Sequence, residues 1–208
     1  FFIVFEGVEG CGKSFQSKKL FNNLKKYSID AVLTREPGGT KSSELIRNLI
    51  LKDYFNKNSK EKFDKYTDTL LYLAARNEHV KNKIKPALNK KKVVICDRFT
   101  DSTIAYQVDG KKVDINFINN IHKKILEGIK PNIVFILKVS SKSSKSRLIK
   151  RKTKNRYDNF AQSFYAKAQR SFIKLSKNKK NYFVFDSSSN NNILEKKIFS
   201  IVNKYLKT

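Results

Sequence analysis

Hydrophobic positions along the chain alternate between short apolar runs and longer stretches with helical spacing. Five runs have the continuous apolar character of strands buried on both faces, at residues 2–5, 31–33, 93–96, 133–139 and 182–185. Between them, apolar residues recur at helical intervals over residues 14–26, 42–51, 66–88, 114–127, 141–150, 160–176 and 191–206. This alternation predicts an α/β fold, in which a five-stranded parallel sheet carries helices on both faces and binds ligands at the carboxyl ends of its strands.

The chain contains no internal repeat and no long linker rich in Gly or Pro, so we expect residues 1–208 to form a single domain. Two segments, 52–65 and 150–159, are polar and rich in basic residues, which is typical of solvated loops. No apolar run approaches the roughly 20 residues that span a bilayer, so no membrane association is expected. We see no secretory signal, and the absence of Met leads us to expect that the natural N-terminus has been trimmed. Two cysteines do not make a disulfide framework in a chain of this length, and a cytoplasmic location is therefore expected.

The chain carries 45 Lys and Arg residues against 18 Asp and Glu, giving a formal net charge of +27. Such a charge suggests nucleic-acid binding, but the lysines are spread over nearly every predicted surface and no recognisable binding motif accompanies them. We therefore expect no nucleic-acid partner, although a basic surface would still attract anionic nucleotides.

A glycine-rich segment follows the first apolar run and opens the first helical stretch. Its sequence is Gly7-Val8-Glu9-Gly10-Cys11-Gly12-Lys13-Ser14. The glycines allow backbone N–H groups to surround phosphate oxygens, Lys13 can reach the β- and γ-phosphates, and the Ser14 hydroxyl can bind Mg²⁺. The alternative, a glycine turn that happens to precede Lys-Ser, is disfavoured by the flanking strand and helix.

Charged residues also follow two other predicted strands. Arg35 and Glu36 precede a Pro-Gly-Gly turn that would place them at the mouth of the sheet. Asp97 ends an apolar strand, where P-loop enzymes hold Mg²⁺, and the adjacent Arg98 can bind two phosphate oxygens. A simple salt bridge at the strand end is the alternative.

Tyr72 and Arg76 lie four residues apart in one predicted helix and so share a face. An aromatic ring beside a guanidinium donor suits a pyrimidine base with carbonyl oxygens, although a core Tyr with a surface Arg would have the same spacing. His79 and His122 show no partner pattern, and we expect both at the surface.

Four segments, residues 6–14, 34–40, 71–76 and 97–107, make the chain resemble the thymidylate kinase (dTMP kinase) family of the bacterial type. The resemblance runs from Phe2 to about Tyr205. The first segment marks only a phosphate loop, whereas the second and fourth together are highly specific. The resemblance implies the P-loop nucleoside monophosphate kinase fold, with a short basic lid at about residues 150–159, and a homodimer.

The resemblance also implies roles for individual residues. ATP and Mg²⁺ would be bound by the phosphate loop, with Arg147 stacking on adenine, and the metal would be near Ser14, Asp97 and Glu36. In the dTMP site, Glu9 would lie near the sugar 3′-hydroxyl, Arg47 and Arg98 would grip the phosphate, Tyr72 would stack on thymine and Arg76 would donate to its carbonyl. The remaining substrate-binding residues implied are Arg35, Glu36, Pro37, Ser102, Thr103, Tyr106 and Gln107. The catalytic residues implied are Lys13, Arg98, Glu9 and, in the lid, Arg151 and Arg156.

The chain departs from the family in the lid, where Asn-Arg-Tyr-Asp at 155–158 replaces the more usual Asp-Arg-apolar-Glu. Lys138 stands where many members carry Asp, and Phe15 stands where Thr is common. The sequence predicts an ATP-dependent dTMP kinase. The alternatives are a kinase for another nucleoside monophosphate and a P-loop ATPase that binds nucleic acid.

Overall fold

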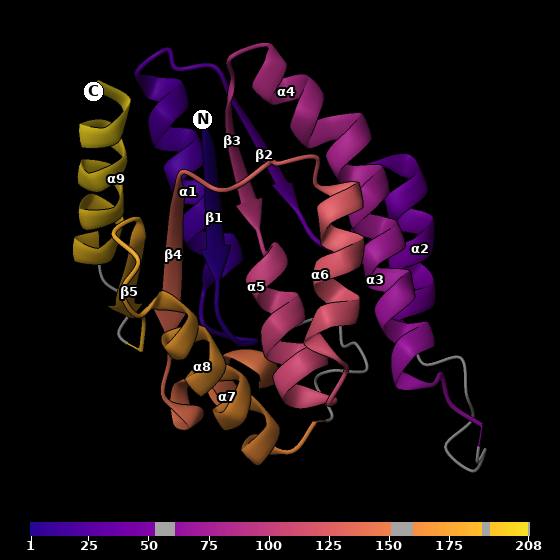
Figure 1. Cartoon of the computed structure of the whole chain (residues 1–208). Coiled ribbons are helices and arrows are strands. Elements are labelled where there is room, and N and C mark those ends of the chain that lie inside the picture. Colours follow the sequence, from indigo (N-terminus) through magenta and orange to yellow (C-terminus); the bar gives the residue numbers. More distant parts are fainter. Residues whose placement is uncertain (53–60, 151–159, 189–191, 208) are drawn as a thin grey trace.

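The computed structural model describes residues 1–52, 61–150, 160–188 and 192–207. Five strands form one parallel sheet in the order β2-β3-β1-β4-β5 (Figure 1). Their bounds are β1 Phe2–Glu6, β2 Ala31–Arg35, β3 Val93–Asp97, β4 Ile133–Lys138 and β5 Tyr182–Asp186. Each begins at the residue where a predicted apolar run begins, and all neighbouring strands pair in parallel, so the predicted parallel sheet is confirmed.

Side chains alternate between the two faces of the sheet, and both faces are covered. Phe5 and Phe135 are neighbours in register and in ring contact, and Phe135 in turn contacts Phe183, whose ring meets Tyr205 of α9 (Asn192–Lys207). Phe2 lies an odd number of residues from Phe5, so its side chain points to the opposite face, where its ring contacts that of Phe99. The strands β1, β3 and β4 are therefore buried from both sides, which explains their continuous apolar runs.

The predicted helices are present, with ends shifted by one or two residues. They are α1 Lys13–Lys26, α2 Lys41–Leu51, α6 Ile115–Ile125, α7 Ser141–Ile149, α8 Gln162–Ser176 and α9. The stretch predicted at 66–88 is divided into α3 Lys65–His79, a π-helical turn η1 Val80–Ile84, and α4 Lys85–Asn89. Figure 1 shows α2 and α3 packed side by side at one edge of the molecule.

One helical segment was not predicted. It consists of α5 Thr100–Thr103 and the π-helical η2 Ile104–Gly110, directly after β3. Its first turn is rich in Thr, Asp and Ser, which favour caps and turns over helix interiors, so no helical apolar stripe marks it. Packing against α8 stabilises it, through contacts of the Tyr106 ring with Phe164 and Phe172.

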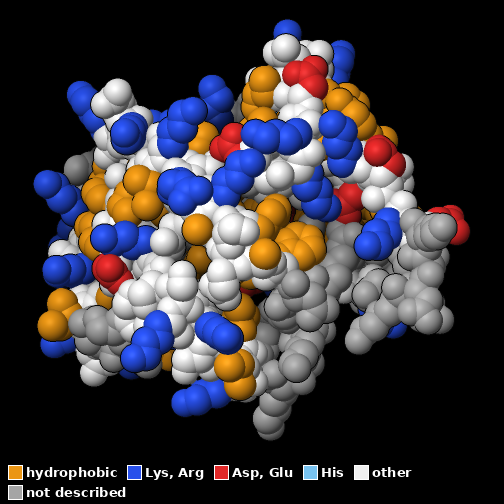
Figure 2. All heavy atoms as spheres, turned by 90° about the horizontal axis from the view of Figure 1, so that it is seen from below, with side chains coloured by type: hydrophobic (Ala, Val, Ile, Leu, Met, Phe, Trp, Pro, Cys, Tyr) orange, Lys and Arg blue, Asp and Glu red, His pale blue; other side chains and the backbone are white. Residues whose placement is uncertain are grey.

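Basic side chains are distributed over the face drawn in Figure 2, with few acidic ones among them. On this face the basic residues are therefore not confined to a single patch. No helix among the described residues is both long and apolar enough to cross a membrane.

Candidate active site

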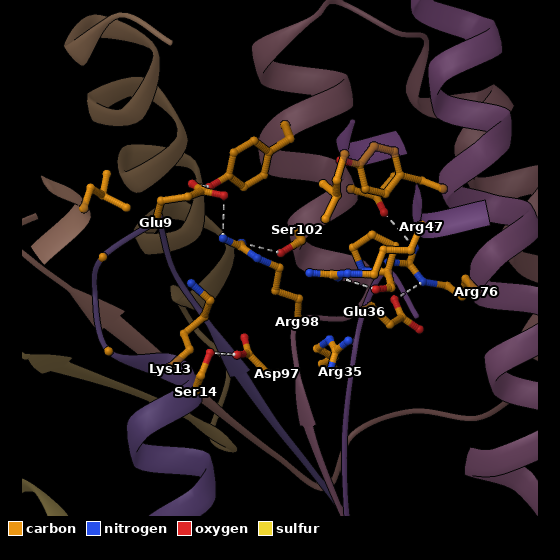
Figure 3. Close-up of a pocket in the computed structure, with 18 of the residues that line it drawn as sticks. Glu9, Lys13, Ser14, Arg35, Glu36, Arg47, Arg76, Asp97, Arg98 and Ser102 are labelled. Carbon is orange, nitrogen blue, oxygen red and sulfur yellow. Dashed lines mark hydrogen bonds and ion pairs between the residues drawn. The ribbon is translucent and has the colours of Figure 1, made fainter. Parts of the chain in front are cut away.

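A cavity of about 460 Å³ opens at the carboxyl ends of β1, β2 and β3 (Figure 3). The loops and helices that follow these strands supply its lining, as the strand-end rule for parallel sheets predicts. Most of the predicted site residues line it: Glu9, Gly10, Gly12, Lys13, Ser14, Arg35, Glu36, Pro37, Arg47, Tyr72, Arg76, Asp97, Arg98, Ser102, Thr103, Tyr106, Gln107 and Arg147.

The glycine-rich segment forms a tight loop between β1 and α1. Gly7 has a φ of 139°, and a Cβ there would lie 2.4 Å from the Leu137 carbonyl oxygen, so only glycine fits. Gly12 has a φ of 88° and precedes the first turn of α1. Lys13 is buried, and its Nζ donates to the carbonyl oxygens of Gly7 and Val8 at 3.0 and 2.9 Å. The ammonium group is thus held inside the loop, where a phosphate oxygen would meet it.

Two members of this loop turn away from the cavity. Val8 and Cys11 have buried side chains in the main core, so they can offer a ligand only backbone groups. Burial raises the pKa of the Cys11 thiol, which keeps it protonated and supports its interpretation as a small packing residue.

Residues distant in sequence hold the loop from outside. Arg147 on α7 donates to the Gly10 carbonyl oxygen at 3.1 Å and to that of Ser187 at 2.6 Å. Ser187 donates its hydroxyl to the Cys11 carbonyl oxygen at 2.6 Å, and Ser144 donates to that of Glu9 at 2.9 Å. Arg147 therefore links the phosphate loop to the segment after β5, and its role beside adenine stays a prediction.

Ser14 and Asp97, two of the residues predicted to lie near the metal, are in contact with each other. The Ser14 hydroxyl donates a short hydrogen bond to Asp97 Oδ2, which joins the start of α1 to the end of β3. Among the described residues, no cluster of three or more His, Cys, Asp or Glu side chains is suited to a metal. Mg²⁺ needs no such cluster, because it is usually held by one or two carboxylates together with water and substrate phosphates.

Arg98 has a φ of 74°, an uncommon backbone conformation for a non-glycine residue that is often found at functional sites. Its guanidinium donates to Glu9 Oε1 at 2.8 Å, to the Gly7 carbonyl oxygen at 2.9 Å and to the Ser102 hydroxyl at 3.1 Å. Tyr106 donates its hydroxyl to Glu9 Oε2 at 2.5 Å. Although burial opposes it, the charges of Arg98 and Lys13 and this hydrogen bond lower the pKa of Glu9. Glu9 is therefore a carboxylate at the cavity wall.

Two arginines near the Pro-Gly-Gly turn differ in exposure. Arg35 is exposed and donates to Glu44 at 3.0 and 3.1 Å. Arg47 on α2 is partly buried and donates a short hydrogen bond to the Pro37 carbonyl oxygen, which directs it along the cavity wall. Both line the cavity, and substrate binding by Arg35 and phosphate binding by Arg47 stay predictions.

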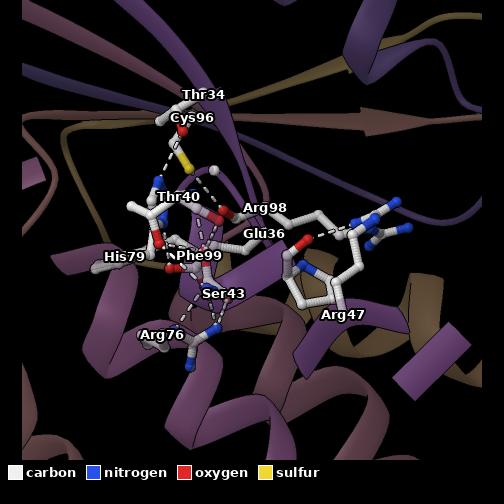
Figure 4. Close-up of polar contacts among 12 residues, drawn as sticks. Thr34, Glu36, Thr40, Ser43, Arg47, Arg76, His79, Cys96, Arg98 and Phe99 are labelled. Atoms are coloured by element: carbon white, nitrogen blue, oxygen red, sulfur yellow. Dashed lines mark hydrogen bonds and ion pairs between the residues drawn. The ribbon is translucent and has the colours of Figure 1, made fainter. Parts of the chain in front are cut away.

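Glu36 and Arg76 form a buried ion pair beneath the same turn (Figure 4). Glu36 Oε2 accepts a hydrogen bond from Arg76 Nε at 2.7 Å and lies 2.7 Å from Nη2 in the ion pair, and its Oε1 is 3.1 Å from Nδ1 of His79. The charge of Arg76 and the hydrogen bond from His79 lower the pKa of Glu36 despite its burial. Because both carboxylate oxygens are paired, a metal near Glu36 would compete with Arg76 and His79 for them.

The expectation that His79 and His122 lie at the surface was wrong. His79 is fully buried between Thr34 and Glu36, and His122 is 8% exposed and contacts Arg76. Spacing within one helix cannot reveal these partners, because each comes from a different element of the fold. The sequence also did not indicate Leu51 and Leu148 as cavity-lining residues, whereas Phe15 had been singled out only as a departure from the family.

The wall expected to contact the base contains Tyr72, Thr103 and Gln107. The nitrogen Nε2 of Gln107 is buried and has no hydrogen-bond partner among the described residues, so it can donate to an acceptor on a ligand or to water. The lid residues Arg151 and Arg156 lie outside the described residues.

A phosphate loop and a polar wall with Arg76, Thr103 and Gln107 line one cavity on a five-stranded parallel sheet, and this arrangement is that of a P-loop nucleoside monophosphate kinase. The family model described as thymidylate kinase matches residues 5–198. The chain belongs to the thymidylate kinase family.

Individual relatives are similar to this chain over nearly its whole length. A thymidylate kinase from Wolbachia pipientis subsp. Culex pipiens (strain wPip) is 39% identical over 208 residues, covering 98% of this chain and 96% of the relative. One from Aster yellows witches'-broom phytoplasma (strain AYWB) is 40% identical over 211 residues, covering 99% and 96%. The crystal structure of thymidylate kinase from Ehrlichia chaffeensis superimposes with a TM-score of 0.75 at 30% identity, covering 97% of this chain and 98% of that one.

Proposed function

We propose that this chain transfers the γ-phosphoryl group of ATP to dTMP with the help of Mg²⁺, forming dTDP and ADP for dTTP synthesis. The observation that carries the proposal is the shared cavity. Lys13 and Ser14 of a phosphate loop line one part of it, and the predicted acceptor residues Tyr72, Arg76 and Gln107 line another. Membership of the thymidylate kinase family supports dTMP as the acceptor.

The donor side of the cavity fits ATP and Mg²⁺ by its chemistry. The loop directs the Lys13 ammonium inward, and α1 begins immediately after Gly12, so the positive end of its dipole faces the phosphates. Ser14 and Asp97 supply a hydroxyl and a carboxylate, the hard oxygen ligands that Mg²⁺ prefers. Bound there, Mg²⁺ would neutralise charge on the β- and γ-phosphate oxygens.

The acceptor side offers a cation for the phosphate and a polar wall for the base. Arg98 reaches over the phosphate loop from the end of β3, and Arg47 approaches from α2. Gln107 has an unsatisfied buried N–H donor, which suits a carbonyl oxygen of thymine. Tyr72 would stack on the ring, as the family resemblance implies.

The reaction requires alignment and charge neutralisation. The phosphate of dTMP is already an anionic nucleophile, so no general base is needed. Lys13 and Arg98 would stabilise negative charge as the phosphoryl group moves, and a lid arginine, Arg151 or Arg156, would complete this set. Closure of the lid proposed at residues 150–159 of this single domain would exclude water from the transferred group.

A homodimer is also part of the proposal. Leu45 and Leu49 of α2 and Leu70 of α3 are 71%, 44% and 48% exposed, and these two helices pack together. Exposed leucines on adjacent helices suit burial against a second copy. Sedimentation velocity of the native protein and of Leu45→Lys tests this, since the charge should shift the native dimer towards monomer.

We also propose a cytoplasmic location, which suits two free, buried cysteines.

A coupled assay of ADP release with a panel of nucleoside monophosphates, each with and without Mg²⁺, tests the proposed function. We expect turnover with dTMP and Mg²⁺, little with dCMP or purine monophosphates, and none after chelation. Turnover with another monophosphate but not dTMP would identify a different kinase. ATP hydrolysis stimulated by DNA or RNA, without turnover of dTMP, would identify a nucleic-acid-dependent ATPase.

A further inference from the structure

His122 is buried on α6 and contacts the guanidinium expected to read the base. Its Nε2 lies 2.8 Å from Nη1 of Arg76, which belongs to α3. An arginine can only donate hydrogen bonds, so Nε2 of His122 must be the acceptor and its proton must lie on Nδ1. Burial and the charge of Arg76 lower the pKa of His122 to about 3, outweighing the opposite effect of Glu36, so the ring is neutral near pH 7.

Arg76 has five N–H donors, and four of them make hydrogen bonds within the protein. Nε donates to Glu36 Oε2, and Nη2 donates to the Phe99 carbonyl oxygen at 2.8 Å while lying 2.7 Å from Glu36 Oε2 in the ion pair. The two Nη1 protons go to Thr103 Oγ1 at 2.6 Å and to His122 Nε2. A base carbonyl can therefore accept from Nη1 of Arg76 only if Thr103 or His122 gives way.

The Glu36 side of Arg76 is anchored firmly. His79 bridges Glu36 Oε1 and the Thr34 hydroxyl, whose oxygen is 2.7 Å from Nε2 of His79. The turn closes tightly over this ring, because a Cβ at Gly39 would lie 2.6 Å from His79 Nε2. Releasing Glu36 would leave a buried carboxylate without its cation, so this end of the guanidinium should stay in place.

The two acceptors of Nη1 differ in their access to the cavity. Thr103 lines it, and its hydroxyl can rotate to a ligand when it gives up its hydrogen bond from Arg76. His122 is not among the lining residues, so no ligand could replace Arg76 as the donor to its buried nitrogen. The Thr103 contact is consequently the one that a base can exchange.

We propose that His122 is a positioning residue for base recognition: it retains one Nη1 proton of Arg76, so that the other is passed from Thr103 to a carbonyl oxygen of the pyrimidine. This inference rests on the proposed function and names a residue that determines specificity in the same site. It gives His122 a role through Arg76, without contact to the substrate.

Two variants at this position separate positioning from packing. His122→Leu removes the acceptor, whereas His122→Gln provides an amide oxygen in its place. For His122→Leu we expect the KM for dTMP to rise about tenfold and the ratio of kcat/KM for dTMP over dCMP to fall about as much, as for a lost hydrogen bond to a charged group. The KM for ATP and the kcat at saturation should change little, and His122→Gln should recover most of the loss.

The outcomes distinguish this inference from the proposed function. Wild-type protein that does not turn over dTMP overturns the proposed function. Wild-type turnover combined with an unchanged KM and dTMP-to-dCMP ratio in folded His122→Leu overturns the inference. An equal fall in kcat/KM for dTMP and dCMP, together with weaker ATP binding, also overturns the inference, because a residue that only supports packing would have this effect. If His122→Leu does not fold, calorimetric titration of His122→Asn with dTMP replaces it, since the shorter amide cannot reach Arg76 and binding should weaken.

Discussion

The guanidinium of Arg98 lies 2.8 Å from Glu9 Oε1 and so joins the end of β3 to the phosphate loop. Glu9 accepts the Tyr106 hydroxyl on its other oxygen, and the Arg98 guanidinium lies 5.2 Å from the centre of the Tyr106 ring. Arg98 and Tyr106, which lie 89 and 97 residues from Glu9 in the sequence, thus meet at its carboxylate. This arrangement should orient the acceptor-binding groups relative to Lys13.

Tyr106→Phe tests that arrangement with little change in packing. The ring contacts with Phe164 and Phe172 can persist, while Glu9 loses its hydroxyl donor. A hydrogen bond to a charged group contributes about 1.5–3 kcal/mol, so we expect kcat/KM for dTMP to fall at least about tenfold, with the KM for ATP nearly unchanged. Tyr66→Phe is the control, because Tyr66 packs edge-on against Phe117 and does not line the cavity. Equal effects of the two substitutions would contradict the prediction.

Lys13→Ala should abolish most phosphoryl transfer while leaving the fold intact. The ammonium group is held by two loop carbonyl oxygens at the place where phosphate charge is expected. Loss of a preorganised donor to developing charge typically costs about 100- to 1,000-fold in kcat. Steady-state kinetics of this variant and of Lys26→Ala, an exposed lysine at the end of the same helix, measure the effect. Near-normal turnover by correctly folded Lys13→Ala would remove Lys13 from the mechanism.

Arg151→Ala and Arg156→Ala test the lid. If one of these arginines neutralises charge that develops during transfer, its loss should lower kcat more than it raises the KM for dTMP. Lys154→Ala within the same basic segment is the control for a general loss of positive charge. If kcat survives both arginine substitutions, the cation must come from another part of the protein.

Arg76→Ala should lower stability as well as discrimination between substrates. Arg76 and Glu36 are both buried, and removing one partner of a buried ion pair typically costs about 3–5 kcal/mol. Urea unfolding measures this free energy, and the double variant Arg76→Met, Glu36→Gln should recover part of it because no charge is left unpaired. The ratio of kcat/KM for dTMP over dCMP should also collapse, and an unchanged ratio would mean that Arg76 does not read the base.

Glu6 should make stability depend on pH. Its carboxyl is buried beneath α5 and accepts from the backbone N–H groups of Phe99 and Ser102 and from the Ser102 hydroxyl. Burial, and next the nearby Asp101, raise the pKa of Glu6, whereas the Ser102 hydrogen bond and Arg98 oppose the shift. The folded state therefore keeps a proton that the unfolded chain releases above its ordinary value of about 4.5.

The sign of this effect follows from linkage. The contribution of Glu6 is complete below about pH 4.5 and is lost as the pH rises through the raised folded-state value, with a slope of at most about 1.4 kcal/mol per pH unit. Urea midpoints measured between pH 5 and 8 should fall more steeply for the native protein than for Glu6→Gln, which cannot titrate. Parallel curves for the two proteins would show that Glu6 does not hold the extra proton.

The sequence by itself determined the strands, most helices and the phosphate loop. These features are local: a strand buried on both faces needs a continuous apolar run, and the phosphate loop needs glycines at set positions before Lys13. The resemblance to the family then placed Arg98, Arg76 and Gln107 at one site, and these residues line one cavity in the structure. The helical segment with Gln107 was missed because packing on α8, rather than an apolar stripe of its own, stabilises it.

Only the tertiary structure decided which charged and polar groups pair beneath the cavity. Glu36, Arg76 and His122 come from the end of β2, from α3 and from α6, and no spacing within one element indicates that they meet. The same applies to His79, whose two ring nitrogens contact residues 43 and 45 positions away in the sequence. The physical reason is that a buried polar group must find partners wherever the fold supplies them, and those partners are set by how the elements pack.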